Sequence, residues 1–266
     1  MSIYKVYKLS NKKFKFFLII NVYNEGKALH KYLKRISKKR NFGVMVADSP
    51  SSDGSTKTNI LKKYEVDIVL RMNKRSDHSK TLMSVADYFV NQKKTSVNGL
   101  IICDGNGKDN PMFAKKFIKK INEGYEFIQG SRFLKKNMEK NTPFSRKILI
   151  KLIHAPLTSI ACRKYFTDTT NGFRAISFKF LKKNFKKLKK QKLKYYEFYF
   201  YISYLASRNG YKVCEIPVTR FYPKNKIVTK IQTFKQYWQM LRPPLLQAIG
   251  IKYVLWSIFR LTYLLF

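Results

Sequence analysis

The chain has 266 residues, of which 45% are hydrophobic, so it can bury one substantial core and is not a disordered polymer. Its 55 Lys and Arg side chains against 15 Asp and Glu give a formal net charge of +40, far more than solubility requires. We therefore expect a polyanionic partner, either a nucleic acid or an anionic membrane surface, although a compositional bias toward Lys explains part of the excess.

The three cysteines, Cys103, Cys162 and Cys214, lie far apart and lack the CxxC spacing of a metal knuckle. We expect buried free thiols in a reducing compartment. Near the N-terminus, basic residues precede an apolar stretch, but that stretch has only the length of a strand and runs into Tyr-Asn-Glu instead of a cleavage site. We therefore interpret it as a strand and expect no signal peptide.

Strand patterns and helical patterns alternate from residue 16 onward. Apolar runs of strand length occupy residues 16–22, 42–48, 66–72, 98–104 and 125–132. The segments between them place apolar residues at helical spacing, over 26–39, 53–64, 79–92 and 110–122. This alternation predicts an α/β fold with a mostly parallel, Rossmann-like sheet that is flanked by helices.

Polar groups follow four of these strand patterns. Parallel sheets bind ligands in the crevice beyond the carboxyl ends of their strands, so these groups are expected to share one edge: Tyr23, Asn24 and Glu25, then Asp48, Asp104, and Ser131 with Arg132. A helix start with Asn24 as N-cap and Glu25 in the first turn explains that pair equally well. For Asp104, a plain polar turn is the alternative to a binding role.

Six sequence blocks occur in order between residues 16 and 223: LIINVYNEG, VADSPSSDGST, ICDGNGKDNP, GSRF, TDTTNGFRAIS and YEFYFYISYLASRNGYKVCEIPV. Their order and spacing resemble the family two glycosyltransferases, in the form found in dolichyl- and polyprenyl-phosphate sugar transferases. Any single block would recur by chance, but six in order are specific. The resemblance implies a GT-A fold over residues 1–223, followed by C-terminal helices over 224–266.

The resemblance also implies a metal-dependent enzyme with a nucleotide-diphosphate sugar as donor. In that family a divalent cation on the third block neutralises the departing diphosphate. Asp104 and Asn106 would hold Mg²⁺ or Mn²⁺, and Asn106 replaces the usual second Asp, which weakens the electrostatic pull. Asp109 would restore an acid near the ion if its loop turned back. The nucleotide would be held by Tyr23, Glu25 and Asp48, although Ser49 and Pro50 depart from the family pattern after that last acid.

The acceptor side contains arginines and two further acids. Arg132 and Arg146 fall where polyprenyl-phosphate transferases place arginines for the lipid phosphate. A phosphate acceptor is largely dianionic at neutral pH and needs no general base. A saccharide hydroxyl would need one, and Asp168 or Glu197 would then serve, unless Asp168 only orders its loop. Arg174 is expected to pair with Asp168 or with the diphosphate.

The C-terminal part has a different pattern. Residues 224–242 predict a basic amphipathic helix, which Pro243 and Pro244 are expected to end. Residues 245–266 are apolar enough to reach across a bilayer, but Lys252 and Arg260 interrupt them, which favours a helix lying in the interface. Docking onto the chain's own domain or onto a second copy in a homo-oligomer is the alternative. The expected location is cytoplasmic, peripheral on the cytoplasmic face of the membrane.

Three functions remain from the sequence. The favoured one is an inverting transfer of a sugar from a nucleotide-diphosphate donor to a polyprenyl phosphate. The second uses the same donor and a saccharide hydroxyl, as in surface-polysaccharide assembly. The third is a non-catalytic, basic nucleic-acid-binding protein, which is the least favoured because no nucleic-acid module pattern occurs and the aromatic residues lie in apolar strands and helices.

Overall fold

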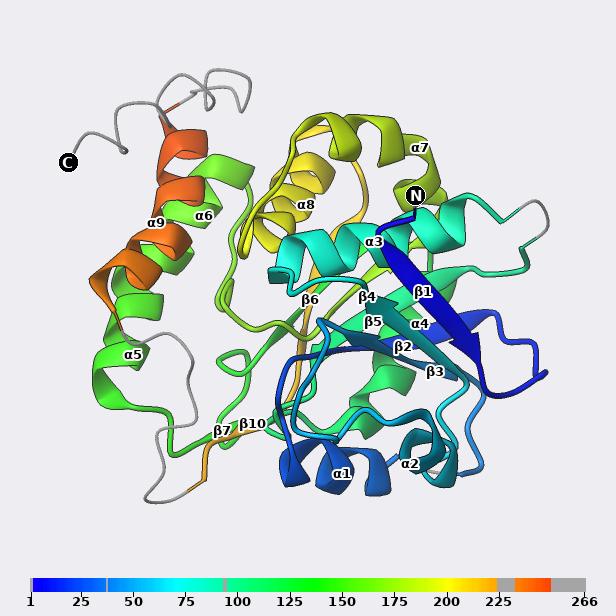
Figure 1. Cartoon of the computed structure of the whole chain (residues 1–266). Coiled ribbons are helices and arrows are strands. Elements are labelled where there is room, and N and C mark those ends of the chain that lie inside the picture. Colours follow the sequence, from blue (N-terminus) through cyan, green and yellow to red (C-terminus); the bar gives the residue numbers. More distant parts are fainter. Residues whose placement is uncertain (1, 37, 93–94, 224–232, 250–266) are drawn as a thin grey trace, which may run out of the picture.

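The computed structural model describes residues 2–36, 38–92, 95–223 and 233–249. In these residues an eight-stranded sheet runs in the order β1-β4-β3-β2-β5-β8-β6-β9 (Figure 1). The strands are β1 Tyr4–Lys8, β2 Phe16–Val22, β3 Gly43–Asp48, β4 Ile68–Met72, β5 Gly99–Asp104, β6 Phe127–Ser131, β8 Arg174–Ser177 and β9 Val213–Pro217. A small parallel ladder joins β7 Glu139–Lys140 to β10 Arg220–Phe221.

The sheet is mostly parallel, as predicted. Strand β2 pairs in parallel with β3 and β5, β3 with β4, and β6 with β9. Two antiparallel strands were not predicted: β1 on the outer edge of β4, and β8, which lies between β5 and β6. Because β8 runs antiparallel to β5, it begins beside the carboxyl end of β5, and the segment that precedes it forms part of the site described below.

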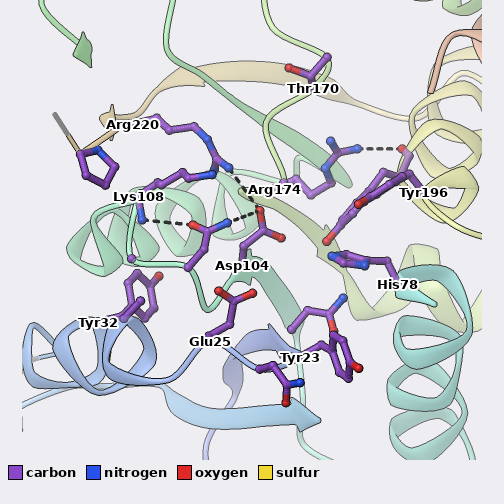
Figure 2. Close-up of a pocket in the computed structure, with 18 of the residues that line it drawn as sticks. Tyr23, Glu25, Tyr32, His78, Asp104, Lys108, Thr170, Arg174, Tyr196 and Arg220 are labelled. Carbon is purple, nitrogen blue, oxygen red and sulfur yellow. Dashed lines mark hydrogen bonds and ion pairs between the residues drawn. The ribbon is translucent and has the colours of Figure 1, made fainter. Parts of the chain in front are cut away.

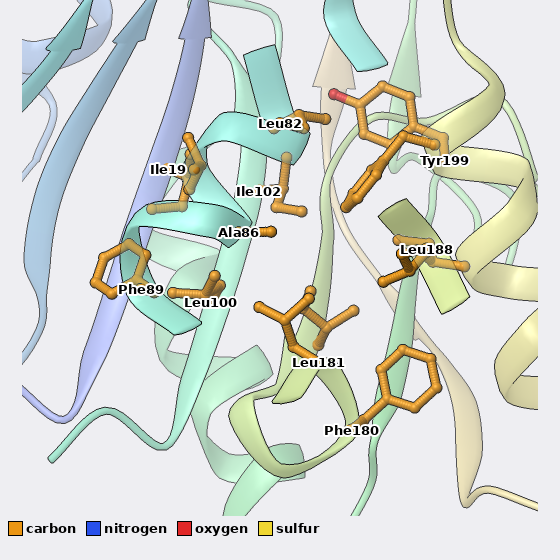
Figure 3. Close-up of a cluster of buried hydrophobic side chains, with 14 of the residues drawn as sticks. Ile19, Leu82, Ala86, Phe89, Leu100, Ile102, Phe180, Leu181, Leu188 and Tyr199 are labelled. Atoms are coloured by element: carbon orange, nitrogen blue, oxygen red, sulfur yellow. The ribbon is translucent and has the colours of Figure 1, made fainter. Parts of the chain in front are cut away.

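Helices cover both faces of the sheet, because side chains alternate along each buried strand. Phe17 and Ile19 of β2 face a core under α3 His78–Val90, α7 Phe178–Lys190 and α8 Glu197–Arg208, which Figure 3 shows. Leu18 and Ile20 face the opposite core, under α1 Lys27–Lys34, α2 Thr58–Lys63 and α4 Ala114–Asn122, the last preceded by a 3-10 turn, η1 Pro111–Phe113. A sheet buried on both faces needs nearly continuous apolar strands, and β2 is buried at all seven positions.

A third group of helices lies beside the sheet (Figure 1). It consists of α5 Phe144–Ile148, the π-helical η2 Leu149–His154 and α6 Ala155–Cys162, which follow one another without a break, and of α9 Phe234–Ala248. Helix α9 packs against α6 and α8. The described end of the chain therefore contacts the rest of the protein through α6 and α8.

Helix α9 corrects one expectation. Pro243 and Pro244 lie inside the helix and do not end it. A helical proline leaves the carbonyl four residues earlier without its backbone donor. For Pro244 that carbonyl belongs to Met240, and the imidazole Nε2 of His154 lies 3.2 Å from its oxygen. His154, the last residue of η2, therefore supplies the missing hydrogen bond to the Met240 carbonyl, and α9 continues to Ala248.

The rest of the expected C-terminal helices, 224–232 and 250–266, lies outside the described residues. None of the helices in the described part of the chain combines the length and apolarity needed to span a membrane. The cysteines are free, as predicted, with Cys103 and Cys162 buried and Cys214 only partly so.

Candidate functional site

A cleft of about 870 Å³ opens at the carboxyl ends of β2 and β5 (Figure 2). The predicted residues Tyr23, Asn24, Glu25, Asp104, Asn106, Arg146 and Arg174 line it. Asp48, Arg132, Asp168 and Glu197 are buried and are not among the residues that line it. The predicted edge of the sheet therefore carries a cleft, and only part of the predicted set faces it.

Asp104 ends β5 at the centre of the cleft. Its Oδ2 accepts hydrogen bonds from Asn106 Nδ2 and from Arg220 Nη2, each at 3.3 Å. Burial acts to raise the pKa of Asp104, but the positive charges of Arg220, His78 and Lys108 outweigh it and hold that pKa below its usual range. The carboxylate is therefore ionised at neutral pH.

Arg220 lines the cleft and was not predicted from the sequence. Its Nη1 lies 2.5 Å from Oδ2 of Asp109, so one guanidinium bridges Asp109 and Asp104. An antiparallel backbone bridge between Asp109 and Arg220 holds the two segments together. Asp109 does turn back toward Asp104, as its spacing allowed, but its buried carboxylate is bound to the guanidinium. Arg220 is one of many basic residues after the sixth block, and no local pattern marks it.

Lys108 lines the same cleft and is only 6% exposed. Its ammonium lies 4.7 Å from the centre of the Tyr222 ring. Desolvation by burial and the nearby charge of Arg220 lower the pKa of Lys108 to about 8. A lysine with a lowered pKa beside an arginine marks a region of positive potential that favours an anionic ligand.

The residues around Asp104 do not fit the expected pair of metal ligands. The amide oxygen of Asn106 accepts the backbone N–H of Lys108 at 3.2 Å, and its amide nitrogen faces Asp104. One oxygen of Asp104 is already bound by Arg220. Within the described ranges no group of three or more His, Cys, Asp or Glu side chains could hold a metal ion. A divalent cation at Asp104 would meet a carboxylate that already binds Arg220, with Lys108 beside it and Glu25 as the other carboxylate of the cleft.

The buried Asp48 side chain holds the predicted nucleotide-binding turn in place. Its carboxylate is fully buried and accepts hydrogen bonds from Ser51, Thr56 and Arg71. The hydroxyl of Ser51 in turn accepts the backbone N–H of Asn24 at 3.0 Å. Asp48 therefore positions the segment between Tyr23 and Glu25 without facing the cleft itself.

Asn24 does not cap the following helix. The N-cap of α1 is Gly26, no side chain caps it, and its first turn contains no acid, so the expectations for Asn24 and for Glu25 in that turn are both wrong. The side chain of Asn24 instead accepts the backbone N–H of Ser52 at 2.8 Å, and Asp53 accepts that of Gly26 at 2.8 Å. These bonds join the two predicted nucleotide loops, because each loop satisfies backbone donors of the other. The guanidinium of Arg75 lies over the Tyr23 ring, 4.7 Å from its centre.

Arg132 and Asp168 are bound to each other. Nε of Arg132 lies 2.6 Å from Oδ2 of Asp168 and Nη2 lies 3.2 Å from Oδ1, and both side chains are at most 1% exposed. Arg174, which the sequence suggested as the partner of Asp168, donates instead to the carbonyls of Tyr199 and Asn171. The side chain of Glu197 accepts the backbone N–H of Lys194 at the start of α8.

His154 joins the C-terminal helix to the loop over the cleft. Its Nδ1 lies 2.6 Å from Oγ1 of Thr169, which lines the cleft, while Nε2 faces the carbonyl of Met240. Burial lowers the pKa of His154 to about 4, so the ring is neutral at pH 7. A neutral ring that donates from Nε2 to the carbonyl accepts the Thr169 hydroxyl at Nδ1.

Two known proteins have sequences similar to this chain. An uncharacterized protein of Methanocaldococcus jannaschii is 28% identical over 207 residues, which are 77% of this chain and 81% of that protein. A dolichol-phosphate mannosyltransferase of Pyrococcus furiosus is 25% identical over 165 residues, 60% of this chain and 45% of that protein.

The fold also matches a solved structure. Glucosyl-3-phosphoglycerate synthase of Mycobacterium tuberculosis, in complex with Mn²⁺, UDP and glucosyl-3-phosphoglycerate, superposes with a TM-score of 0.60 at 14% identity, covering 90% of this chain and 81% of that one. This likeness confirms the expected GT-A fold. The model of the family described as "Glycosyl transferase family 2" matches residues 17–198, which is more than half of the chain. The protein therefore belongs to glycosyl transferase family 2.

Proposed function

We propose that the protein transfers a sugar, with inversion, from a nucleotide-diphosphate donor to a polyprenyl phosphate. An oxygen of the acceptor phosphate attacks the anomeric carbon as the bond to the donor diphosphate breaks, and the nucleoside diphosphate leaves. A phosphomonoester dianion becomes a diester monoanion in this step, so no proton has to be removed. The observation that carries the proposal is that both predicted base residues are buried and engaged.

Neither Asp168 nor Glu197 is available as a general base. A general base must reach the proton that it removes, at hydrogen-bond distance or through one water. Both oxygens of Asp168 are bound to Arg132 in a buried ion pair, and Glu197 is bound at the start of its own helix. A saccharide hydroxyl would therefore lack either expected base, whereas a phosphate needs none.

The charge of the cleft favours an anionic donor. Two carboxylates, Glu25 and Asp104, face seven basic side chains among the described residues that line it: Lys27, Lys31, Arg35, Lys108, Arg146, Arg174 and Arg220. Such an excess attracts a diphosphate and a second phosphate group. Tyr23 and Glu25, which line the cleft on the loop that Asp48 supports, are proposed to contact the nucleotide. Arg146 enters the cleft from α5 and is proposed to bind the acceptor phosphate.

The surface beside Arg146 supports a lipid acceptor. Phe144, Leu152 and Ile160 are 77%, 71% and 62% exposed, and they recur at intervals of eight residues along α5, η2 and α6. Ile148 is exposed on the same run. An apolar helical surface next to a phosphate-binding arginine suits a prenyl chain whose headgroup enters the cleft from an anionic membrane surface.

The test supplies purified protein with UDP- and GDP-sugars and with either undecaprenyl phosphate or a saccharide. We expect a product that partitions into organic solvent, is labile to mild acid and has the inverted anomeric configuration. A product on the saccharide alone would overturn the acceptor and keep the donor chemistry. If no nucleoside diphosphate bound in calorimetry, and the protein bound duplex DNA with a steep salt dependence, the enzyme itself would be excluded.

A further inference from the structure

The donor end of the cleft contains two cations that the chain itself holds in place. Arg220 is fixed by Asp109, whose carboxylate is fully buried and 2.5 Å from the guanidinium, and it reaches Asp104 at 3.3 Å with its other terminal nitrogen. Lys108 lies on the loop between these two acids and faces the same opening, as Figure 2 shows.

Backbone contacts keep the two cations adjacent. The N–H of Phe221 donates to the carbonyl of Lys108 at 2.9 Å, next to the bridge between Asp109 and Arg220. The loop from Asp104 to Asp109 and strand β10 are therefore held together through their backbones, and Asp109 and Asn171 fix the guanidinium of Arg220 on that frame. Fixed charges stabilise a developing negative charge well because they need not reorganise as the charge appears.

The acids of this loop are already balanced by these cations. Asp104 and Asp109 supply two negative charges, and Arg220 and Lys108 supply two positive ones. A diphosphate that entered would meet the Arg220 and Lys108 side chains next to each other, whereas a divalent cation would meet a guanidinium already bound to Asp104, one of the two carboxylates that line the cleft. Asn106, with its oxygen occupied by the Lys108 N–H, adds no charge to attract a metal.

We propose that Lys108 and Arg220 bind the donor diphosphate in the place where a divalent cation would act, so that donor binding and turnover persist when divalent cations are removed. Nη1 of Arg220 is engaged by Asp109 and Asn171 and one N–H of Nη2 by Asp104, so the guanidinium offers the second N–H of Nη2 to a phosphate oxygen, and the ammonium of Lys108 offers a point charge. Asp104 and Asp109 are positioning residues for Arg220. This inference rests on the proposed donor, and it assigns to side chains the charge compensation that was expected of Mg²⁺ or Mn²⁺.

The primary test measures binding of UDP and GDP by calorimetry, with the full chain in an excess of EDTA and again with Mn²⁺. We expect affinity for at least one of them to agree within about twofold between the two conditions. Affinity that appears only with Mn²⁺ would overturn the inference and leave the proposed function standing. No binding in either condition would instead contradict the proposed donor, so the two failures are distinguishable.

Variants identify the side chains responsible. Lys108→Gln should weaken nucleoside diphosphate binding in EDTA by about tenfold or more, the loss expected for one charge-assisted hydrogen bond. Lys108→Arg should recover most of it. The matched control is Lys115→Gln, which removes the same charge from an exposed side chain of α4 that does not line the cleft, and it should leave binding unchanged. Equal weakening by both Gln variants would mean that only net charge matters, and would overturn the assignment.

Arg220 needs a milder change, because its loss would leave Asp109 buried and unpaired. Arg220→Lys keeps the charge but removes the two-pronged geometry, and we expect weaker diphosphate binding with an unchanged unfolding midpoint. A double variant that makes the loop more acidic should also make nucleoside diphosphate binding depend on a divalent cation. Asn106→Asp combined with Lys108→Gln adds a carboxylate and removes a cation, so binding should become stimulated by Mn²⁺. A double variant that stayed insensitive to Mn²⁺, with wild-type affinity in EDTA, would contradict the proposal.

Discussion

Arg132 and Asp168 form a two-point ion pair that is sealed from solvent, with Nε 2.6 Å from Oδ2. The same carboxylate accepts the backbone N–H groups of Arg132 and Thr170, and Arg132 donates to the Thr170 hydroxyl. The pair therefore connects the end of β6 to the loop whose Thr169 and Thr170 line the cleft. Its position explains how two residues expected to touch the substrate contribute to the site from beneath it.

Arg132→Ala should lower the free energy of unfolding by about 3 to 5 kcal/mol, because it leaves an uncompensated buried carboxylate. Urea denaturation measures the loss. Lys187→Ala, an exposed change on α7, is the control and should stay within about 0.5 kcal/mol. If Arg132→Ala unfolded at the wild-type urea concentration and impaired only the use of the acceptor, a direct contact with the acceptor phosphate would be the better explanation.

His154 should make the protein less stable in acid. Its pKa is about 4 in the folded protein and about 6.5 in an unfolded chain, so between these values the unfolded state binds a proton that the folded state does not. The stabilising effect of the neutral ring is fully present above pH 6.5 or so, and it is lost as the pH falls toward 4, for a total of roughly 3 kcal/mol.

The measurement compares wild type with His154→Gln by urea unfolding at several pH values. Gln keeps a donor and an acceptor but does not titrate in this range. The stability advantage of wild type should shrink as the pH falls from about 6.5 to 4. A constant difference across that window would mean that the ring is not held neutral in the fold.

Gly172→Ala should disturb the donor site with little effect on the fold. A Cβ at this position would lie 3.1 Å from both carboxylate oxygens of Asp104, which Arg220 and Asn106 hold in place. Displacing that carboxylate should lower kcat/KM by about tenfold to a hundredfold. Steady-state kinetics with a saturating acceptor tests this, and a circular dichroism melt checks folding. Wild-type kcat/KM would mean that Asp104 can move freely.

Leu152→Glu should weaken binding to vesicles that contain anionic lipid by about tenfold or more, because it removes a large apolar side chain from the exposed surface of η2. Ile3→Glu, an equally drastic change at a 50% exposed position beside β1, is the matched control. Flotation with vesicles measures both, and UDP binding should be unchanged in each. Similar losses from both substitutions would point to net charge as the cause.

The parallel part of the fold was predictable because it follows from local pattern. Strand β2 has the predicted bounds, and β3, β4, β5 and β6 begin one or two residues later than predicted. Antiparallel β8 was not predictable in the same way. Its four residues, Arg174–Ser177, are too short for periodicity to stand out, and their place between β5 and β6 depends on long-range pairing.

The site was predictable where residues follow strands directly, as Glu25 and Asp104 do. It was not predictable where a side chain's direction decides its role. Arg132 and Arg146 resemble one another as basic residues in adjacent blocks, yet one is buried on Asp168 and the other lines the cleft. Arg220 was missed because its partner acids are more than a hundred positions away, and only the folded chain reveals that relationship.

The bridge from Asp104 to Arg220 joins residues 116 positions apart. If the loop from Asp104 to Asp109 alone were moved to another scaffold, its two carboxylates would lack the Arg220 guanidinium that neutralises them. The charge of that loop therefore depends on both segments, because without Arg220 its two carboxylates would favour a cation over the phosphate that we propose. Exchange of donor preference between relatives would have to move both segments together.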